Sequence, residues 1–232
     1  MGKKERLNRT EMLIGDEALE ILGGSHVAIF GLGGVGGSVV EALARAGVGA
    51  LTLVDMDRVD ESNINRQVIA TYDTIGVDKT EAARKRVFSI CPECEVSTFK
   101  QFVLPGQFGN IGDFSRFDYV VDAIDNIAGK IAIIAAAKDA EVPVISAMGA
   151  GNKMNPEKFI IDDISNTKVC PLAKIMRKKI RELGIENVAA LYSTEEPIKT
   201  GYKTPGSMSY VPPIAGLMIG GYVIRELIKC ND

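Results

Sequence analysis

The chain has 232 residues, of which 46% are hydrophobic and 25% are charged. These values are ordinary for a globular protein and exclude extensive disorder. The formal net charge of −3 gives no overall attraction to nucleic acid, so a nucleic-acid partner would need a local basic patch.

Strands and helices are predicted to alternate along the first 150 residues. Short apolar runs predict strands at 26–32, 50–57, 94–100, 118–125 and 142–150. Apolar residues at helical spacing predict helices at 33–48, 79–90 and 130–140. This alternation indicates a Rossmann-like α/β fold, with a mostly parallel sheet and helices on both faces.

The regular alternation of strands and helices ends after Gly151. A strand and turn are predicted at 155–167, a basic amphipathic helix at 171–185, a strand at 187–194, a loop at 198–213 and a final apolar helix. We expect one domain over residues 1–232, with a nucleotide-binding core at about 6–150 and a C-terminal elaboration of the same sheet at about 151–232. The final apolar run is shorter than the roughly 20 residues of a membrane span, so we expect a buried helix and no membrane association.

A glycine-rich turn lies between the first predicted strand and the first predicted helix. Gly31, Gly33 and Gly36 form a GxGxxG pattern, with Gly34 inside it. Such glycines allow a tight turn and let phosphates approach the backbone at a helix N-terminus. Asp55 ends the next strand, where an acidic residue binds ribose in dinucleotide-binding folds. These residues alone would suggest an NAD-dependent oxidoreductase.

Further polar residues downstream fit ATP better than a dinucleotide. Basic side chains near the loop would neutralise a triphosphate, and a carboxylate at a strand end can hold Mg²⁺. The predicted nucleotide-binding residues beyond the glycines and Asp55 are Asp57, Asn63, Arg66, Gln67, Lys79, Asp122 and Asp125.

The stretches GLGGVGG, LVDMDRVDESNINRQ and VDAIDN, with Lys79, resemble the adenylation domain of the E1-like (ThiF) superfamily. That domain is shared by ubiquitin-activating enzymes and bacterial sulfur-carrier-protein adenylyltransferases. The resemblance implies that Asp55 binds the ribose and that Asn63, Arg66 and Lys79 contact the phosphates. One departure is Gly37, which intervenes before Ser38 where the family's glycine run usually reaches serine.

The same resemblance implies a metal ligand and a homodimer. Asp125 would hold Mg²⁺, and Arg9 in the segment RLNR would reach the ATP of the partner subunit. Catalysis would then rest on positioning and charge neutralisation by Mg²⁺ with Arg9, Arg66, Lys79 and Asp125.

The cysteines argue against a structural zinc site and against a thioester intermediate. With a polar start and no secretory signal, we expect a cytoplasmic protein with reduced Cys91, Cys94, Cys170 and Cys230. The related adenylyltransferases usually hold zinc with two CxxC pairs, but only Cys91 and Cys94 have that spacing here, so no structural zinc is expected. Cys170 is a weak candidate for a thioester cysteine.

The C-terminal third carries a narrower resemblance. The stretches DDISNTKVCPLAKIMRKKIRELGI and PGSMSYVPPIAGLMIGGYVIREL resemble the tRNA threonylcarbamoyladenosine dehydratases. The resemblance implies ATP-dependent adenylation of the carboxylate of the modified adenosine, followed by ring closure through a nitrogen of the same side chain. The basic segment could bind tRNA phosphates; its candidate residues are Lys168, Lys174, Arg177, Lys178 and Arg181.

Three alternatives stay open from the sequence. The chain could adenylate the C-terminus of a ubiquitin-like sulfur-carrier protein, with a carrier or sulfur-transfer protein as partner. It could be an NAD-dependent oxidoreductase, or a nucleotide-binding module without activity, although Arg66, Lys79 and Asp125 argue against the last.

Overall fold

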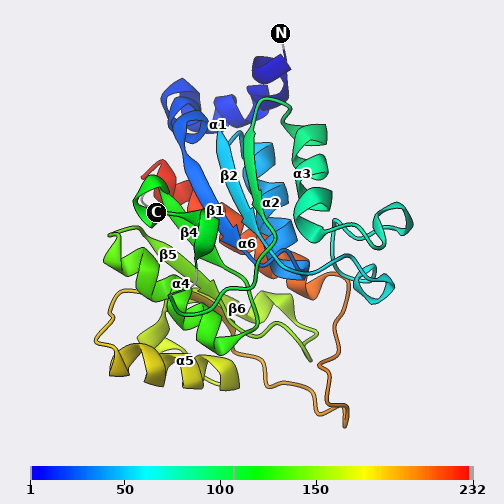
Figure 1. Cartoon of the computed structure of the whole chain (residues 1–232), viewed down its shortest axis with the longest axis vertical. Helices are drawn as coiled ribbons and strands as arrows, with labels where there is room; N and C mark the ends of the chain where they lie inside the picture. The colour runs from blue at the N-terminus through cyan, green and yellow to red at the C-terminus, as the bar shows by residue number, and fades with distance from the viewer. Residues whose placement is uncertain (1, 107, 230–232) are drawn as a thin grey trace.

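The computed structural model describes residues 2–106 and 108–229, in which helices cover both faces of one sheet (Figure 1). The strands are β1 (His26–Phe30), β2 (Ala50–Val54), β3 (Glu95–Phe99), β4 (Tyr119–Asp122), β5 (Val144–Ala147), β6 (Phe159–Asp163) and β7 (Ala189–Ser193). The α-helices are α1 (Gly2–Gly24), α2 (Gly34–Ala46), α3 (Lys79–Ile90), α4 (Ile127–Asp139), α5 (Pro171–Glu182) and α6 (Val211–Leu227). Short 3₁₀ helices are η1 (Glu61–Asn63), η2 (Tyr72–Thr74), η3 (Gly109–Ile111), η4 (Phe114–Arg116), η5 (Pro156–Lys158) and η6 (Ile164–Asn166).

The strand order is β3-β2-β1-β4-β5-β7-β6. Neighbouring strands are parallel except β6, which runs antiparallel to β7. The chain builds outward from β1 to β3 and then returns to place β4 on the other side of β1. Ligands bind at such a reversal in open α/β sheets, beyond the carboxyl ends of the strands.

The register at the reversal determines which residues meet there. Phe30, the last residue of β1, pairs with Val54 of β2 on one side and with Asp122 of β4 on the other. The residues that follow all three strands therefore leave the sheet at the same level, and their side chains converge on one place.

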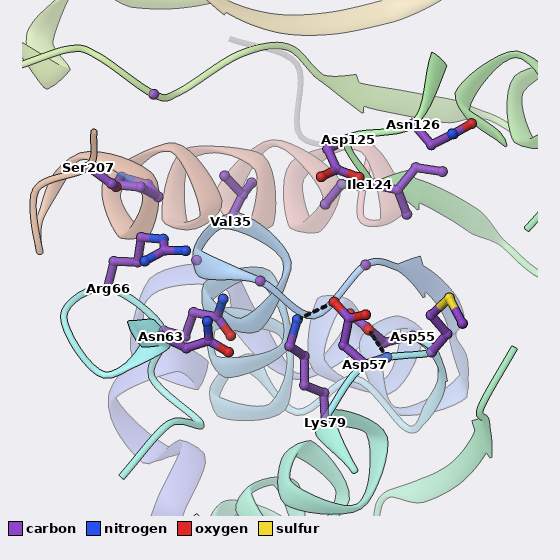
Figure 2. Close-up of a pocket in the computed structure, with 18 of the residues that line it drawn as sticks. Val35, Asp55, Asp57, Asn63, Arg66, Lys79, Ile124, Asp125, Asn126 and Ser207 are labelled. Carbon is purple, nitrogen blue, oxygen red and sulfur yellow. Dashed lines mark hydrogen bonds and ion pairs between the residues drawn. The ribbon is translucent and has the colours of Figure 1, made fainter. Parts of the chain in front are cut away.

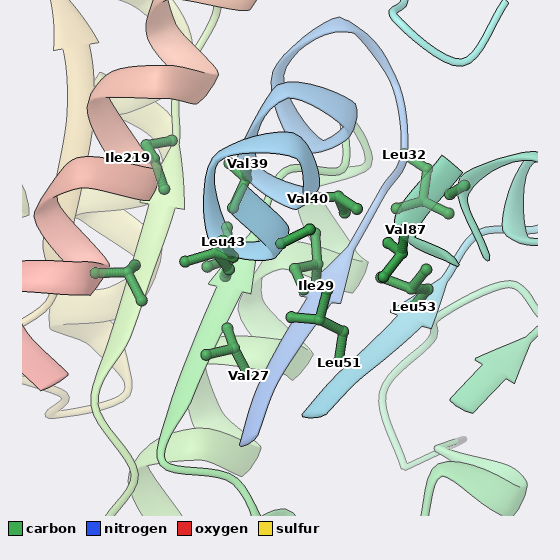
Figure 3. Close-up of a cluster of buried hydrophobic side chains, with 14 of the residues drawn as sticks. Val27, Ile29, Leu32, Val39, Val40, Leu43, Leu51, Leu53, Val87 and Ile219 are labelled. Atoms are coloured by element: carbon green, nitrogen blue, oxygen red, sulfur yellow. The ribbon is translucent and has the colours of Figure 1, made fainter. Parts of the chain in front are cut away.

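Apolar side chains form one core on each face of the sheet, because strand residues alternate between the faces. One core joins β1 and β2 to α2, α3 and α6, and it includes Ile29, Leu43, Leu53 and Ile219 (Figure 3). The other joins the opposite faces of the strands to α4 and α5. Both faces are covered, as the continuous apolar character of the strands requires.

The final helix packs closely on α2. A Cβ added to Gly216 would lie 2.2 Å from the carbonyl oxygen of Val35, and one added to Gly220 would lie 2.5 Å from Cβ of Ala42. The absence of side chains at these two positions thus lets the helices approach each other. Within the described part of the chain, none of the helices has the length and apolar character needed to cross a bilayer.

The predicted fold class is confirmed: the sheet is mostly parallel, and β6 and β7 of the C-terminal third join it. The strand and helix positions agree to within a few residues, and α3 has the predicted bounds. Helix α1 was not predicted. Its polar sequence has a weak apolar pattern, it is kinked at Gly15, and Met12 and Leu13 are each 85% exposed.

The contact between α2 and α6 yields a test of the fold. We expect Gly216→Ala to lower the free energy of unfolding by about 1–3 kcal/mol, because the added methyl group overlaps the backbone of α2. Gly221→Ala on the same helix is the matched control, since its Cβ would lie 3.6 Å from the flexible guanidinium group of Arg225.

Urea unfolding of both variants measures the difference. The control should match the wild-type protein or gain up to about 1 kcal/mol from helix propensity. Equal stability of the two variants would contradict the close packing of α6 on α2.

Candidate active site

An open pocket of about 530 Å³ lies at the carboxyl ends of β1, β2 and β4, where the strand order reverses (Figure 2). Its lining includes ten of the residues predicted to bind nucleotide. They are Gly31, Gly33, Gly34, Asp55, Asp57, Asn63, Arg66, Gln67, Lys79 and Asp125. The structure therefore brings together residues that lie between Gly31 and Asp125 in the sequence.

Two positions of the glycine turn have no room for a side chain. Gly31 has a φ of +89°, and a Cβ there would lie 2.7 Å from the carbonyl oxygen of Ala123. Gly36 does not line the pocket; a Cβ at this residue would lie 1.8 Å from the carbonyl oxygen of Gly31. Gly31 thus allows the turn to pass the end of β4, and Gly36 allows α2 to pack against that turn.

Asp55 holds this turn in place from the end of β2. One carboxylate oxygen accepts a hydrogen bond from the backbone N–H of Leu32 at 2.6 Å, and the other accepts one from the N–H of Asp57 at 2.8 Å. A carboxylate oxygen has more than one lone pair, so Asp55 can also accept a hydroxyl group of a ligand. Its position fits the ribose-binding role that the resemblance implied.

The two cationic residues of the pocket are held by different means. Lys79 begins α3, is only 6% exposed, and donates to the carboxylate of Asp57 at 2.8 Å. Arg66 donates to the carbonyl oxygen of Ser62 at 2.9 Å and to Oδ1 of Asn65 at 2.7 Å. Both side chains are therefore oriented by contacts within the protein.

Two buried polar atoms in the described part of the pocket have no hydrogen-bond partner within the protein. They are Oε1 of Gln67 and Oγ of Ser207. A buried polar group without a partner costs free energy, and binding of a polar ligand would remove that cost. Ser207 was not predicted, since it belongs to a loop that joins the pocket only in the folded chain.

Other parts of the lining were also missed by sequence reasoning. Gln101, Phe102 and Val103 follow β3, and Ile124 and Asn126 flank Asp125. The segment Thr204–Ser207 of the C-terminal third forms part of the pocket wall, and Gly151 lies beside it. Position after a strand end could have indicated residues 101–103, but no local pattern marks residues 204–207.

Asp122 was predicted to bind nucleotide, and the structure corrects this. Its side chain is fully buried at the end of β4, outside the pocket lining. Its carboxylate accepts hydrogen bonds from Nζ of Lys130 at 2.9 Å, from Oγ of Ser146 at 2.5 Å and from the N–H of Ile124 at 3.3 Å. Asp122 therefore stabilises the loop that contains Asp125, through its bond to the N–H of Ile124.

Arg9 lies on α1 and is not part of the pocket lining within its own chain. In the basic segment, Lys168, Lys174, Lys178 and Arg181 are exposed. Arg177 differs, because its guanidinium group donates to both the carbonyl oxygen and the hydroxyl oxygen of Thr167. That side chain joins α5 to Thr167 in the segment before the helix, so it is a poor candidate for tRNA binding.

Cys91, Cys94 and Cys170 are buried thiols, and Cys230 lies outside the described residues. Burial raises the pKa of the Cys94 thiol to about 12 and also raises the pKa of Cys91. In residues 2–106 and 108–229, no three His, Cys, Asp or Glu side chains gather as metal ligands would. Burial of Cys170 at the start of α5 also removes the exposure that a thioester cysteine needs.

Comparison with known proteins identifies the class to which this fold and site belong. The family model described as "ThiF family" matches residues 7–232. The chain therefore belongs to the ThiF family, which confirms the superfamily predicted from the glycine turn and the motifs after it.

Several similar proteins in that class bear the name of one enzyme. The tRNA threonylcarbamoyladenosine dehydratase of Bacillus subtilis (strain 168) is 40% identical over 242 residues, covering 97% of this chain and 95% of the relative. The crystal structure of E. coli tRNA N6-threonylcarbamoyladenosine dehydratase in complex with ATP has a TM-score of 0.89 and 32% identity, covering 97% of this chain and 95% of that chain. The complex of the same enzyme with AMP gives the same values.

The buried pair beneath the pocket can be tested by its energetics. We expect Lys130→Met to lower the free energy of unfolding by about 3–5 kcal/mol, because it leaves the Asp122 carboxylate buried without its counter-charge. Urea unfolding measures the loss. The double variant Asp122→Asn/Lys130→Met removes both charges and should be more stable than the single variant; a single variant as stable as wild type would contradict the pair.

Proposed function

We propose that the chain is an ATP-dependent tRNA threonylcarbamoyladenosine dehydratase. The observation that carries the proposal is the convergence of Arg66, Lys79 and Asp125 on one pocket beside the glycine turn. The ATP and AMP complexes of the similar E. coli enzyme support a nucleotide at this place. The similarity to dehydratases over nearly the whole chain, including the C-terminal third, favours this activity over the others that the sequence left open.

The first step is adenylation of the substrate carboxylate. A carboxylate oxygen attacks the α-phosphorus of ATP, the bond from that phosphorus to the bridging oxygen breaks, and pyrophosphate leaves with the electron pair. Arg66 and Lys79 face the negative charge that develops on the phosphates, and their fixed orientation lowers the reorganisation needed in the transition state. Asp55 holds the ribose and so aligns the α-phosphorus with the incoming carboxylate.

The second step closes a ring. A nitrogen of the same modified side chain attacks the activated acyl carbon, the bond to the adenylate oxygen breaks, and AMP leaves while the nitrogen loses its proton. The reacting groups belong to one side chain, so their effective concentration is high and no covalent enzyme intermediate is required. The burial of Cys170 is compatible with chemistry that uses no thioester.

The substrate assignment is tested by pyrophosphate exchange and AMP release, measured in parallel with tRNA and with a ubiquitin-like sulfur-carrier protein. We expect activity with tRNA that bears threonylcarbamoyladenosine, and a nucleoside product lighter by one water. The control is the same tRNA without the modification. Activity with the carrier alone would instead support the adenylyltransferase alternative, and tight binding of NAD without binding of ATP in calorimetry would support the oxidoreductase.

Asp125 is the residue proposed to hold Mg²⁺. It is exposed on the loop after β4 and lies across the pocket from Lys79 (Figure 2). Its donor chemistry fits, because Mg²⁺ prefers carboxylate oxygen and needs only one or two protein carboxylates beside phosphate oxygens. When bound, the ion would neutralise charge on the phosphates.

We also propose a homodimer in which Arg9 completes the partner's pocket. Arg9 lies outside the pocket of its own chain, and the strongly exposed Met12 and Leu13 follow it on α1. An apolar surface of this kind is stabilised when a second subunit covers it.

Mixing two inactive variants tests both roles together. Arg9→Ala and Asp125→Ala should each reduce turnover by about 100-fold or more while the fold survives. After subunit exchange of equal amounts, half of the dimers would hold one intact site, so about a quarter of the wild-type activity should return. If the mixture stays as inactive as its components, Arg9 does not act across the interface.

The exposed residues of α5 are proposed as phosphate contacts for the tRNA. Lys174, Lys178 and Arg181 face solvent, while Ala173 and Met176 on the other side of the helix are buried in the core. Because the chain is acidic overall, binding of a polyanion must depend on such local groups.

A further inference from the structure

Residues 198–207 form a loop, here called the strap, whose two ends meet on a single residue. The backbone N–H of Ile198 donates to the carbonyl oxygen of Asn152 at 2.8 Å. The N–H of Gly206 donates to the side-chain Oδ1 of Asn152 at 2.6 Å, and the N–H of Asn152 donates to the carbonyl oxygen of Gly206 at 2.8 Å. The neck of the strap is therefore closed, although no strand or helix contains it.

The C-terminal end of the strap is also attached to the nucleotide pocket. Thr204, Gly206 and Ser207 contribute to the pocket lining. The carbonyl oxygen of Ser207 accepts a hydrogen bond from Nδ2 of Asn65 at 3.1 Å, and Oδ1 of Asn65 accepts one from Arg66 at 2.7 Å. A chain of hydrogen bonds thus connects the strap to a residue proposed to contact the phosphates.

The stem before the strap is fixed as well. The carboxylate of Glu195 accepts hydrogen bonds from the backbone N–H groups of Met154 and Asn155, and its carbonyl oxygen accepts one from Nζ of Lys153. Because Glu195 fixes the stem and Asn152 fixes the neck, residues 199–205 project from a defined base.

The tip of the strap has the composition of a site for single-stranded nucleic acid. Tyr202 is 83% exposed, and Lys199 and Lys203 beside it face solvent. Residues 197–210 contain these two lysines and no Asp or Glu, in a chain with a net charge of −3. The strap extends beyond the body of the molecule at the lower right of Figure 1.

We propose that the strap binds the single-stranded segment of the tRNA substrate next to the reacting nucleotide. Tyr202 stacks on an unpaired base, and Lys199 and Lys203 contact the flanking phosphates. Aromatic rings that stack on bases, combined with basic groups that follow the backbone, are the usual means of binding single-stranded RNA. The inference rests on the proposed function, because it requires tRNA as the substrate.

The position of the strap fits that role. Bases in a loop of RNA can be turned out of their stack, whereas bases in a helix cannot be reached in this way. The strap is continuous with the pocket wall at Thr204–Ser207, and Tyr202 precedes that wall by two residues. Closure of the neck at Asn152 reduces the entropy lost when the strap binds.

The experiment compares tRNA affinity among strap variants of the full-length protein. Tyr202→Ala should weaken binding of modified tRNA by about 5- to 150-fold, the range for loss of one stacked base. Tyr202→Phe keeps the ring and should bind nearly as wild type. The control is Tyr72→Ala, which removes another ring, 75% exposed on η2, that is not part of the pocket.

The lysines are tested through salt dependence. Lys199→Ala/Lys203→Ala should reduce the slope of log affinity against log salt by about 1.4 units, since each phosphate contact to a single strand accounts for about 0.7. The affinity for ATP alone, measured by calorimetry, should stay unchanged in every strap variant, because neither Tyr202 nor the lysines line the pocket.

The outcomes separate the inference from the proposed function. If wild-type protein binds modified tRNA and Tyr202→Ala binds it equally well, the role of the strap is wrong while the dehydratase assignment stands. If wild-type protein binds no tRNA and adenylates a carrier protein, both the role of the strap and the dehydratase assignment are wrong. Equal losses in Tyr202→Ala and Tyr72→Ala would also overturn the inference, because the effect would not be specific to the strap.

Discussion

The active site depends on the close approach of two strand ends, β1 and β4, which are neighbours in the sheet and far apart in the sequence. The turn after β1 passes the backbone after β4 so closely that a Cβ at Gly31 would lie 2.7 Å from the carbonyl oxygen of Ala123. This contact places the glycine turn and the loop of Asp125 on one pocket. It exists because the chain reverses its direction of sheet building between these two strands.

Polar side chains hold both sides of this contact. Asp55 fixes the glycine turn by accepting a hydrogen bond from the backbone N–H of Leu32. Asp122 and Lys130 form an ion pair in which both side chains are 0% exposed, directly below the loop that carries Asp125. A buried pair of this kind contributes little net stability, but the hydrogen bond that Asp122 accepts from the N–H of Ile124 defines the geometry of the loop. Catalysis by positioning and charge neutralisation needs that geometry more than it needs a reactive side chain.

The C-terminal third contributes to the site in two ways. Helix α6 packs on α2, the helix that begins at the glycine turn, and so supports the turn from behind. The strap brings Ser207 to the pocket and is joined to Arg66 through Asn65. The C-terminal third, which carries the narrower family resemblance, thus also contributes residues 204–207 to the pocket wall.

The parallel sheet, the glycine turn and ten of the residues that line the pocket could be predicted from the sequence alone. Strands, helices and strand-end residues such as Asp55 and Asp125 depend on local patterns, and the carboxyl ends of parallel strands necessarily share one edge of the sheet. Only the tertiary structure separated Asp122 from Asp125, because burial depends on the neighbours Lys130 and Ser146 and not on position at a strand end.

The tertiary structure alone also placed the strap. Its ends are joined through Asn152, about 50 residues earlier in the chain, and its wall of the pocket meets Asn65, which is 142 residues from Ser207. Hydrogen bonds over such separations leave no periodic pattern in a single sequence. A polar loop rich in glycine and proline therefore looks the same whether it is free in solvent or closed over an active site.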